Sequence, residues 1–141
     1  MVKYYNFDIV FAEVPDEVTL ALNITNCPNH CGGCHSPHLQ QDIGNILDET
    51  EIKALVDTYV GDITCVCFMG GDATPSEIET LSLFVKKTFP HIKTAWYSGK
   101  KALAENLSPA SFDYIKLGGY KAEFGPLNIK TTNQKFFRIV N

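Results

Sequence analysis

The chain has 141 residues, of which 45% are hydrophobic and 20% are charged, an ordinary composition for a globular protein with one buried core. Its formal net charge of −4, without a cluster of Lys and Arg, argues against nucleic acid as a partner. The length predicts one domain over residues 1–141. The N-terminal residues lack the basic-then-apolar layout of a secretion signal, and no apolar run reaches the roughly 18 residues of a membrane span. We therefore expect a location in the cytoplasm and no membrane partner.

The first predicted element is a strand over residues 17–25, EVTLALNIT, in which apolar and polar residues alternate. It runs directly into a loop with the spacing C-x3-C-x2-C, formed by Cys27, Cys31 and Cys34. Five cysteines in a chain without an export signal are expected to be thiols or metal ligands and not a disulfide framework. The loop is therefore a candidate metal centre.

Two kinds of metal centre suit this loop. Thiolates are the protein ligands of iron–sulfur clusters, and three of them leave one iron of a [4Fe–4S] cube open to a ligand from outside the protein. The alternative is a zinc site in which the three cysteines are joined by His35 or His38, because structural zinc needs four tetrahedral ligands. The loop by itself favours the cluster, with zinc as the alternative.

A helix is predicted next, over residues 48–59, because its apolar residues recur at helical spacing and Asp48 can serve as its N-cap. The short apolar run over residues 63–69 is typical of a buried parallel strand. Cys65 and Cys67 lie two residues apart in this run, so their side chains point to the same face. We expect both to pack in the core as small apolar residues.

The rest of the chain continues the alternation of strands and helices. Pro75 and Ser76 open a predicted helix, strands are predicted over residues 92–97, 112–117 and 135–140, and a short helix is predicted over residues 100–106. This order implies right-handed βαβ units and hence an α/β fold with a mostly parallel sheet.

The turn Gly70-Gly71-Asp72 follows the predicted strand 63–69 and precedes a helix. A lone Gly-Gly-Asp is a common turn. In a parallel sheet, however, this turn lies beside the cysteine loop, at the carboxyl ends of the strands where ligands gather. There the glycine backbone and the carboxylate can receive an α-amino group.

With C-x3-C-x2-C after the first predicted strand and Gly-Gly-Asp after the second, the chain resembles the radical S-adenosylmethionine superfamily. Within it, the chain is most similar to the anaerobic ribonucleoside-triphosphate reductase activating proteins, which use Gly-Gly-Asp and have a Gly before the third cysteine, as Gly33 is here. The segments TAWYSG at 94–99 and TNQK at 132–135 also resemble that family, so the resemblance spans nearly the whole chain.

The resemblance implies a partial (β/α) barrel of the radical S-adenosylmethionine type. It also implies a [4Fe–4S] cluster on Cys27, Cys31 and Cys34, and S-adenosylmethionine bound by the Gly-Gly-Asp turn and the end of the cysteine loop. The implied cofactor-binding residues are Gly33, Cys34, His35, Gly70, Gly71 and Asp72. No catalytic residue is expected beyond the cluster and the cofactor.

The implied function is that of a radical oxidoreductase that cleaves S-adenosylmethionine and generates a glycyl radical on a large anaerobic ribonucleoside-triphosphate reductase, with flavodoxin or ferredoxin as electron donor. Because the chain is shorter than the roughly 200 residues of a closed eight-stranded barrel, we expect an open side through which a protein substrate can enter. The alternatives are an activase of another glycyl-radical enzyme, a small-molecule radical enzyme, and, in a different class, a Cys3His zinc-binding interaction module.

Overall fold

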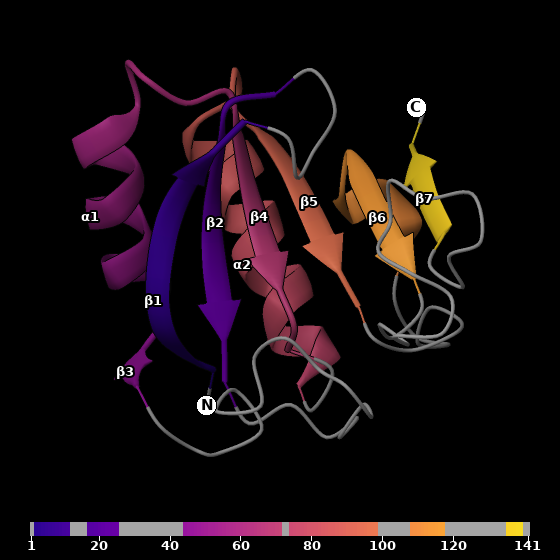
Figure 1. Cartoon of the computed structure of the whole chain (residues 1–141), viewed down its shortest axis with the longest axis horizontal. Coiled ribbons are helices and arrows are strands. Elements are labelled where there is room, and N and C mark those ends of the chain that lie inside the picture. The colour runs from indigo at the N-terminus through magenta and orange to yellow at the C-terminus, as the bar shows by residue number, and fades with distance from the viewer. Residues whose placement is uncertain are drawn as a thin grey trace.

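The computed structural model describes residues 2–11, 17–25, 44–71, 74–98, 108–117 and 135–139. The strands within these ranges form one seven-stranded sheet in the order β3-β1-β2-β4-β5-β6-β7 (Figure 1). The strands are β1 (Lys3–Val10), β2 (Thr19–Ile24), β3 (Asn45–Ile46), β4 (Cys65–Met69), β5 (Lys93–Tyr97), β6 (Tyr114–Leu117) and β7 (Lys135–Arg138).

The centre of the sheet is parallel and its flanks are antiparallel. Strands β2, β4, β5 and β6 pair with one another in parallel, whereas β1 pairs antiparallel with β2 and β3, and β7 pairs antiparallel with β6. Most strands therefore point in one direction, which confirms the predicted α/β fold with a mostly parallel sheet.

Two helices, α1 (Glu49–Tyr59) and α2 (Pro75–Thr88), pack against the same core cluster on one face of the sheet, and Figure 1 shows α2 behind the central strands. Helix α1 begins where the sequence predicts, because the Asp48 side chain accepts a hydrogen bond from the backbone N–H of Glu51 at 2.9 Å and caps the first turn. A short 3-10 helix, η2 (Pro109–Ser111), precedes β6. Neither described α-helix has the length and apolar character needed to cross a membrane.

The main core lies between the sheet and the two helices. Its fully buried side chains come from alternate positions of the central strands and from the inner faces of the helices; they include Leu20, Leu22, Ile52, Val56, Val66, Phe68, Ile78, Val85 and Trp96. This alternation is what a strand with one face toward a helix layer requires.

The opposite face of the sheet carries a second, smaller buried cluster, formed by Cys65, Cys67, Ala95, Tyr97 and Tyr114. Both cysteines are fully buried, which confirms that they pack in the core. No helix among the described residues covers this face (Figure 1). Strand β2 is thus buried on both faces, although its alternating sequence is typical of a strand with one face in water.

Most of the predicted elements agree with the structure. The strands and the first two helices are present with boundaries within a few residues of those expected. Two strands, β1 and β3, were not expected from the sequence. The predicted helix over residues 100–106 lies outside the described residues.

Candidate functional site at the carboxyl edge of the sheet

The parallel strands all end at one edge of the sheet, the lower edge in Figure 1. Thr25, at the end of β2, is the last described residue before Cys27, and Gly71, after β4, is the last before Asp72. Because β2 and β4 are adjacent parallel strands, both segments leave the sheet side by side at the edge where ligands of α/β proteins gather.

The two glycines after β4 have backbone conformations that other residues rarely adopt. The φ angle is +108° at Gly70 and +90° at Gly71. A Cβ atom on Gly70 would lie 3.2 Å from the carbonyl oxygen of Ile24, and one on Gly71 would lie 2.6 Å from two side-chain carbons of Ile78. Both glycines are therefore required for the turn, and Gly70 lies directly against the end of β2.

Strand β5 and the start of α2 hold this turn in place. The backbone N–H of Gly70 donates to the carbonyl of Tyr97 at 2.9 Å, and the indole Nε1–H of the buried Trp96 donates to the carbonyl of Gly70 at 2.6 Å. The N–H of Thr74 donates to the carbonyl of Gly71 at 3.0 Å. These hydrogen bonds preorganise the turn, although Gly71 itself is buried.

A row of polar side chains crosses the helix-free face at the same edge. The strand register brings Asn23, Met69, Tyr97 and Lys116 to equivalent positions on β2, β4, β5 and β6. The Asn23 side chain donates to Oδ1 of Asn6 on β1 at 2.6 Å, and the Lys116 ammonium lies 5.2 Å from the centre of the Tyr97 ring. With Asn6 of β1 beside it, the row presents one cation and two amides, groups that can orient a polar ligand.

Asn23 and Ser98 are polar residues of predicted strands or strand ends that can reach a ligand, but a structural role is the simpler interpretation of each. Ser98 is buried, and its backbone N–H donates to the carbonyl of Lys116 at 2.9 Å, which agrees with a structural role. Lys116 was not predicted as a site residue. Its contact with Tyr97 joins two different strands, and no local sequence pattern indicates such a contact.

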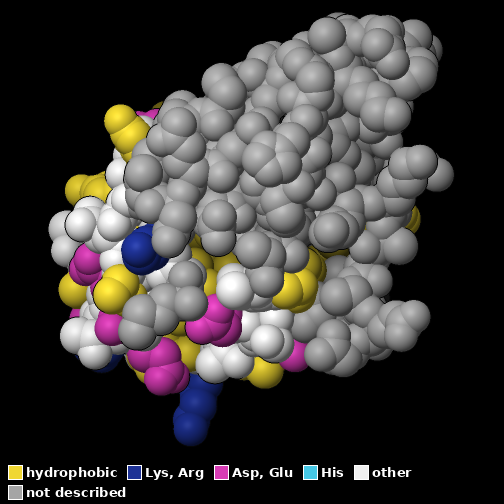
Figure 2. All heavy atoms as spheres, turned by 90° about the horizontal axis from the view of Figure 1, so that it is seen from below, with side chains coloured by type: hydrophobic (Ala, Val, Ile, Leu, Met, Phe, Trp, Pro, Cys, Tyr) yellow, Lys and Arg dark blue, Asp and Glu magenta, His cyan; other side chains and the backbone are white. Residues whose placement is uncertain are grey.

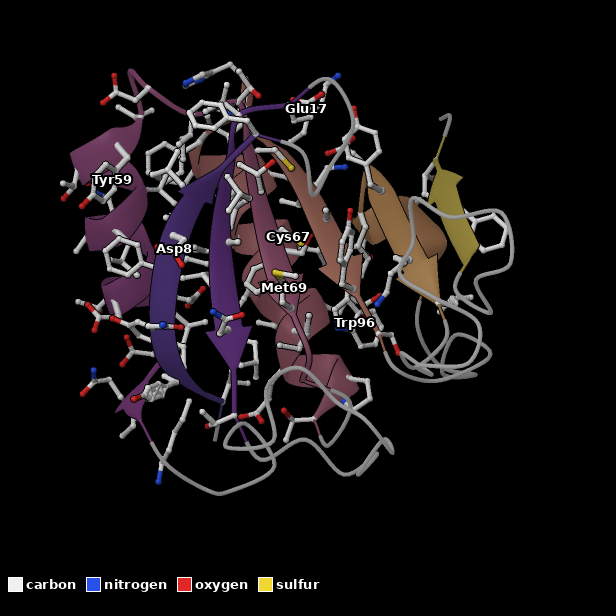
Figure 3. The ribbon with its side chains drawn as sticks, in the orientation of Figure 1. Asp8, Glu17, Tyr59, Cys67, Met69 and Trp96 are labelled. Atoms are coloured by element: carbon white, nitrogen blue, oxygen red, sulfur yellow. The ribbon has the colours of Figure 1, made fainter. Side chains whose placement is uncertain are left out.

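A second polar cluster lies at the amino edge of the same strands. Figure 3 shows Glu17 at the upper end of the sheet and Trp96 toward the lower end. The buried Glu17 carboxylate accepts hydrogen bonds from the hydroxyls of Tyr114 and Thr64, both at 2.7 Å, and lies 3.5 Å from the Lys93 ammonium. These partners come from β5, β6 and the residue before β4, so the carboxylate ties four strands together.

The charges of this cluster agree with a structural role. Burial by itself would raise the pKa of Glu17, but the hydrogen bonds from Tyr114 and Thr64 and the charge of Lys93 outweigh it, so the pKa is lower than usual. Burial, followed by the charge of Glu17, raises the pKa of the Cys65 thiol well above its ordinary value. A thiol held protonated is a poor metal ligand, which agrees with the core role of this cysteine.

Of the predicted site residues, the structure describes Gly70 and Gly71. The others lie outside the described residues: Cys27, Cys31, Gly33, Cys34, His35 and Asp72. Among the residues that are described, no three His, Cys, Asp or Glu side chains form a group that could hold a metal. The metal centre therefore stays a prediction from the spacing of the cysteines.

Comparisons of the chain with protein-family models, with curated proteins and with solved structures found no match. The resemblance to the radical S-adenosylmethionine superfamily accordingly remains a prediction from its motifs.

Proposed function

We propose that this protein is a radical S-adenosylmethionine activase. In this proposal its sheet is the wall of a partial barrel, Cys27, Cys31 and Cys34 hold a [4Fe–4S] cluster, and the substrate is a glycine of a large anaerobic ribonucleoside-triphosphate reductase. The electron donor is a flavodoxin or a ferredoxin, and the protein acts in the cytoplasm.

The observation that carries the proposal is the contact between the end of β2 and the glycine turn. Gly70 is so close to Ile24 that a Cβ atom on it would lie 3.2 Å from the Ile24 carbonyl oxygen. Ile24 precedes Cys27 by only three residues, and Gly70 precedes Asp72 by two. Ile24 and Gly70, from which the three-cysteine motif and the glycine–acid motif continue, thus touch at one edge, although they are 46 residues apart along the chain.

The residues at this edge fit the proposed ligand by their chemistry. The Asp72 carboxylate and the Gly70 and Gly71 carbonyls are acceptors for the N–H groups of an α-amino group. The three cysteine thiolates suit iron and leave one iron open for the amino and carboxylate groups of the ligand.

A cluster held by Cys27, Cys31 and Cys34 would supply the reductive cleavage of S-adenosylmethionine, with one electron from the flavodoxin or ferredoxin, that generates the radical on the partner's glycine. The protein's own task is to hold the ligand in one orientation and to keep water from the radical. The helix-free face beside Asn23, Tyr97 and Lys116 is the side from which we expect the ligand and the glycine loop to approach.

The first test separates the proposed class from the zinc alternative. Protein reconstituted anaerobically should bind about four irons per chain and show a broad visible absorption band, as one cube on three thiolates requires. A colourless protein that binds one zinc through the cysteines and His35 or His38 would favour the interaction module.

The second test concerns the substrate. With a reductant, S-adenosylmethionine and the large reductase from the same genome, we expect a glycyl-radical doublet in the EPR spectrum of the large chain and a comparable amount of 5′-deoxyadenosine. Cofactor cleavage coupled to turnover of a small metabolite, without a radical on a protein, would favour a small-molecule radical enzyme. A radical on a different glycyl-radical enzyme would favour the remaining alternative.

A further inference from the structure

Three successive peptide groups in the turn after β4 are each held by one hydrogen bond. The Gly70 N–H donates to the Tyr97 carbonyl at 2.9 Å, and the Gly71 carbonyl accepts from the Thr74 N–H at 3.0 Å. Both of these bonds join backbone to backbone. The peptide group between them joins Gly70 to Gly71, and its carbonyl accepts from the indole Nε1–H of Trp96 at 2.6 Å. The middle peptide group therefore depends on one side chain.

This middle peptide group is the one that can turn over most easily. It lies between two glycines, so no Cβ atom on either side opposes a rotation that exchanges the directions of its carbonyl and its N–H. Among the described residues, the Gly71 N–H at the other end of the group has no hydrogen-bond acceptor. In this part of the chain, the bond to Trp96 is thus what selects one orientation of the group.

Trp96 is well suited to select an orientation, because its own position is fixed. The side chain is 2% exposed, belongs to the main core, and stacks on Phe112 with ring centres 5.6 Å apart and planes 25° apart. Figure 3 shows it toward the lower end of the sheet, near the carboxyl edge. A buried indole N–H needs an acceptor. The indole and the Gly70 carbonyl therefore satisfy each other only while the carbonyl faces the ring.

The surface at the carboxyl edge favours a ligand that donates hydrogen bonds. Figure 2, which views the molecule from the side of this edge, shows carboxylates beside hydrophobic side chains in the part of the surface that the structure describes. Ionised carboxylates only accept hydrogen bonds, as carbonyls do. A glycine turn that presents a carbonyl matches these surroundings, and one that presents an N–H does not.

We propose that Trp96 is a positioning residue that sets the affinity of the glycine turn for its ligand. This inference rests on the proposed function, in which the turn receives the α-amino group of S-adenosylmethionine. The orientation of the Gly70–Gly71 peptide group decides whether a carbonyl or an N–H meets that amino group. A ligand that binds one of two orientations binds more weakly when the other is populated. By holding the carbonyl, Trp96 keeps the turn in the orientation that binds.

The test removes the indole N–H and keeps the ring. Trp96 is the single tryptophan of the chain. Protein produced with β-(benzothiophen-3-yl)alanine in place of tryptophan, in which sulfur replaces the N–H, is therefore changed at this position alone. Phe112→Leu is the matched control, because it removes the stacked ring and leaves the indole N–H in place. Circular dichroism and thermal unfolding establish that both proteins fold.

The first measurement does not depend on a cluster or a ligand. Amide hydrogen exchange in a peptide that contains Gly70 should be at least threefold faster in the analogue protein than in the unmodified protein, because the middle peptide group is no longer held. Phe112→Leu should change it less than twofold. Equal exchange in the analogue and the unmodified protein would show that the indole does not hold the turn and would overturn the inference.

The second measurement concerns the ligand, in protein reconstituted anaerobically with iron and sulfide. The analogue should weaken S-adenosylmethionine binding roughly three- to tenfold by calorimetry, as expected for the loss of one neutral hydrogen bond, with unchanged iron content. The half-saturating concentration of S-adenosylmethionine for reductant-driven cleavage should rise by the same factor. Phe112→Leu should lower the melting temperature but change the affinity less than twofold.

The outcomes separate this inference from the proposed function. Equal affinity in the analogue and the unmodified protein, or equal losses in the analogue and Phe112→Leu, would make Trp96 a core residue only and would leave the activase standing. Absence of iron and of S-adenosylmethionine binding in the unmodified protein would instead overturn the proposed function, and this inference with it.

Discussion

The two edges of the parallel strands differ in how their polar groups are held. At the amino edge, two hydroxyls donate hydrogen bonds to the Glu17 carboxylate and the Lys93 ammonium lies beside it. At the carboxyl edge, Gly70 and Gly71 have consecutive positive φ angles, and Gly70 lies against Ile24. Both edges are polar and both join several strands. The amino edge has satisfied its polar groups with one another, which is how buried polar groups contribute to stability.

The carboxyl edge differs because its backbone adopts conformations that only glycine adopts readily. Trp96 and Tyr97 impose the turn through hydrogen bonds to Gly70, and the row beside it offers Asn23 and Lys116. The difference teaches that a charged and conspicuous cluster, such as the one around Glu17, can be purely structural. A turn without a charged side chain in its described part can be the better candidate for binding.

The largest expected effect concerns the two groups of cysteines. Replacing Cys27, Cys31 or Cys34 by Ala should remove the iron and the visible band, because a cube that has only three protein ligands cannot afford the loss of one. Cys65→Ala and Cys67→Ala are the matched controls and should keep the full iron content, since both thiols are buried in the core. Retention of iron by Cys31→Ala would contradict the cluster assignment.

The next effect tests the amino edge. Glu17→Ala should lower the free energy of unfolding by about 3 kcal/mol, because it leaves the hydroxyl of the buried Tyr114 without its acceptor. Urea unfolding at pH 7 measures the loss, with Asp62→Ala on an exposed turn as control. A loss under 1 kcal/mol would show that the cluster does not hold the strands together.

The same cluster predicts a dependence on pH. The pKa of Glu17 is lower in the folded protein than its ordinary value of 4.5, so its charge stabilises the fold above pH 4.5, and this contribution is lost as the pH falls through the folded pKa. The difference in unfolding free energy between the unmodified protein and Glu17→Gln should therefore be full at pH 7 and shrink below pH 4.5. A difference that is constant with pH would contradict the charged state.

A smaller effect is expected at the glycine turn. Gly71→Ala should destabilise the fold by about 2–3 kcal/mol, because φ is positive and the new Cβ would overlap the buried Ile78. Gly61→Ala is the control, since nothing lies within 4 Å of its Cβ position, and it should change stability by less than about 1 kcal/mol. Equal melting temperatures for the two variants would mean that the turn readily rearranges.

The smallest effect sharpens the binding side of the comparison. Asp72→Ala should weaken S-adenosylmethionine binding on the order of ten- to a hundredfold, or roughly 1.5–3 kcal/mol, as expected for a charge-assisted hydrogen bond. Iron content should stay intact, because the carboxylate is proposed to contact the amino group and not the metal. Normal affinity by calorimetry would reduce Asp72 to a turn residue.

Local patterns predicted most of the fold. The apolar period and the Asp48 cap located α1, and the short apolar run 63–69 ending at two glycines located β4. Strand β1 was not predicted, because its sequence has no regular alternation of apolar and polar residues. Its antiparallel pairing with β2 shifts register after Tyr4, and the strand lies toward one side of the sheet. The burial of both faces of β2 was also missed, because which faces are covered depends on residues far along the chain.

The sequence by itself determined the chemistry that this protein can offer: three cysteines at C-x3-C-x2-C, a Gly-Gly-Asp turn and the order of strands and helices. These are properties of residue type and spacing, and neighbours in the chain suffice to read them. Tertiary structure alone decided that Gly70 touches the end of β2, that Trp96 holds the turn, and that Glu17 accepts a hydrogen bond from Tyr114, 97 residues away. Such contacts form between strands brought together by burial, and no local pattern carries them.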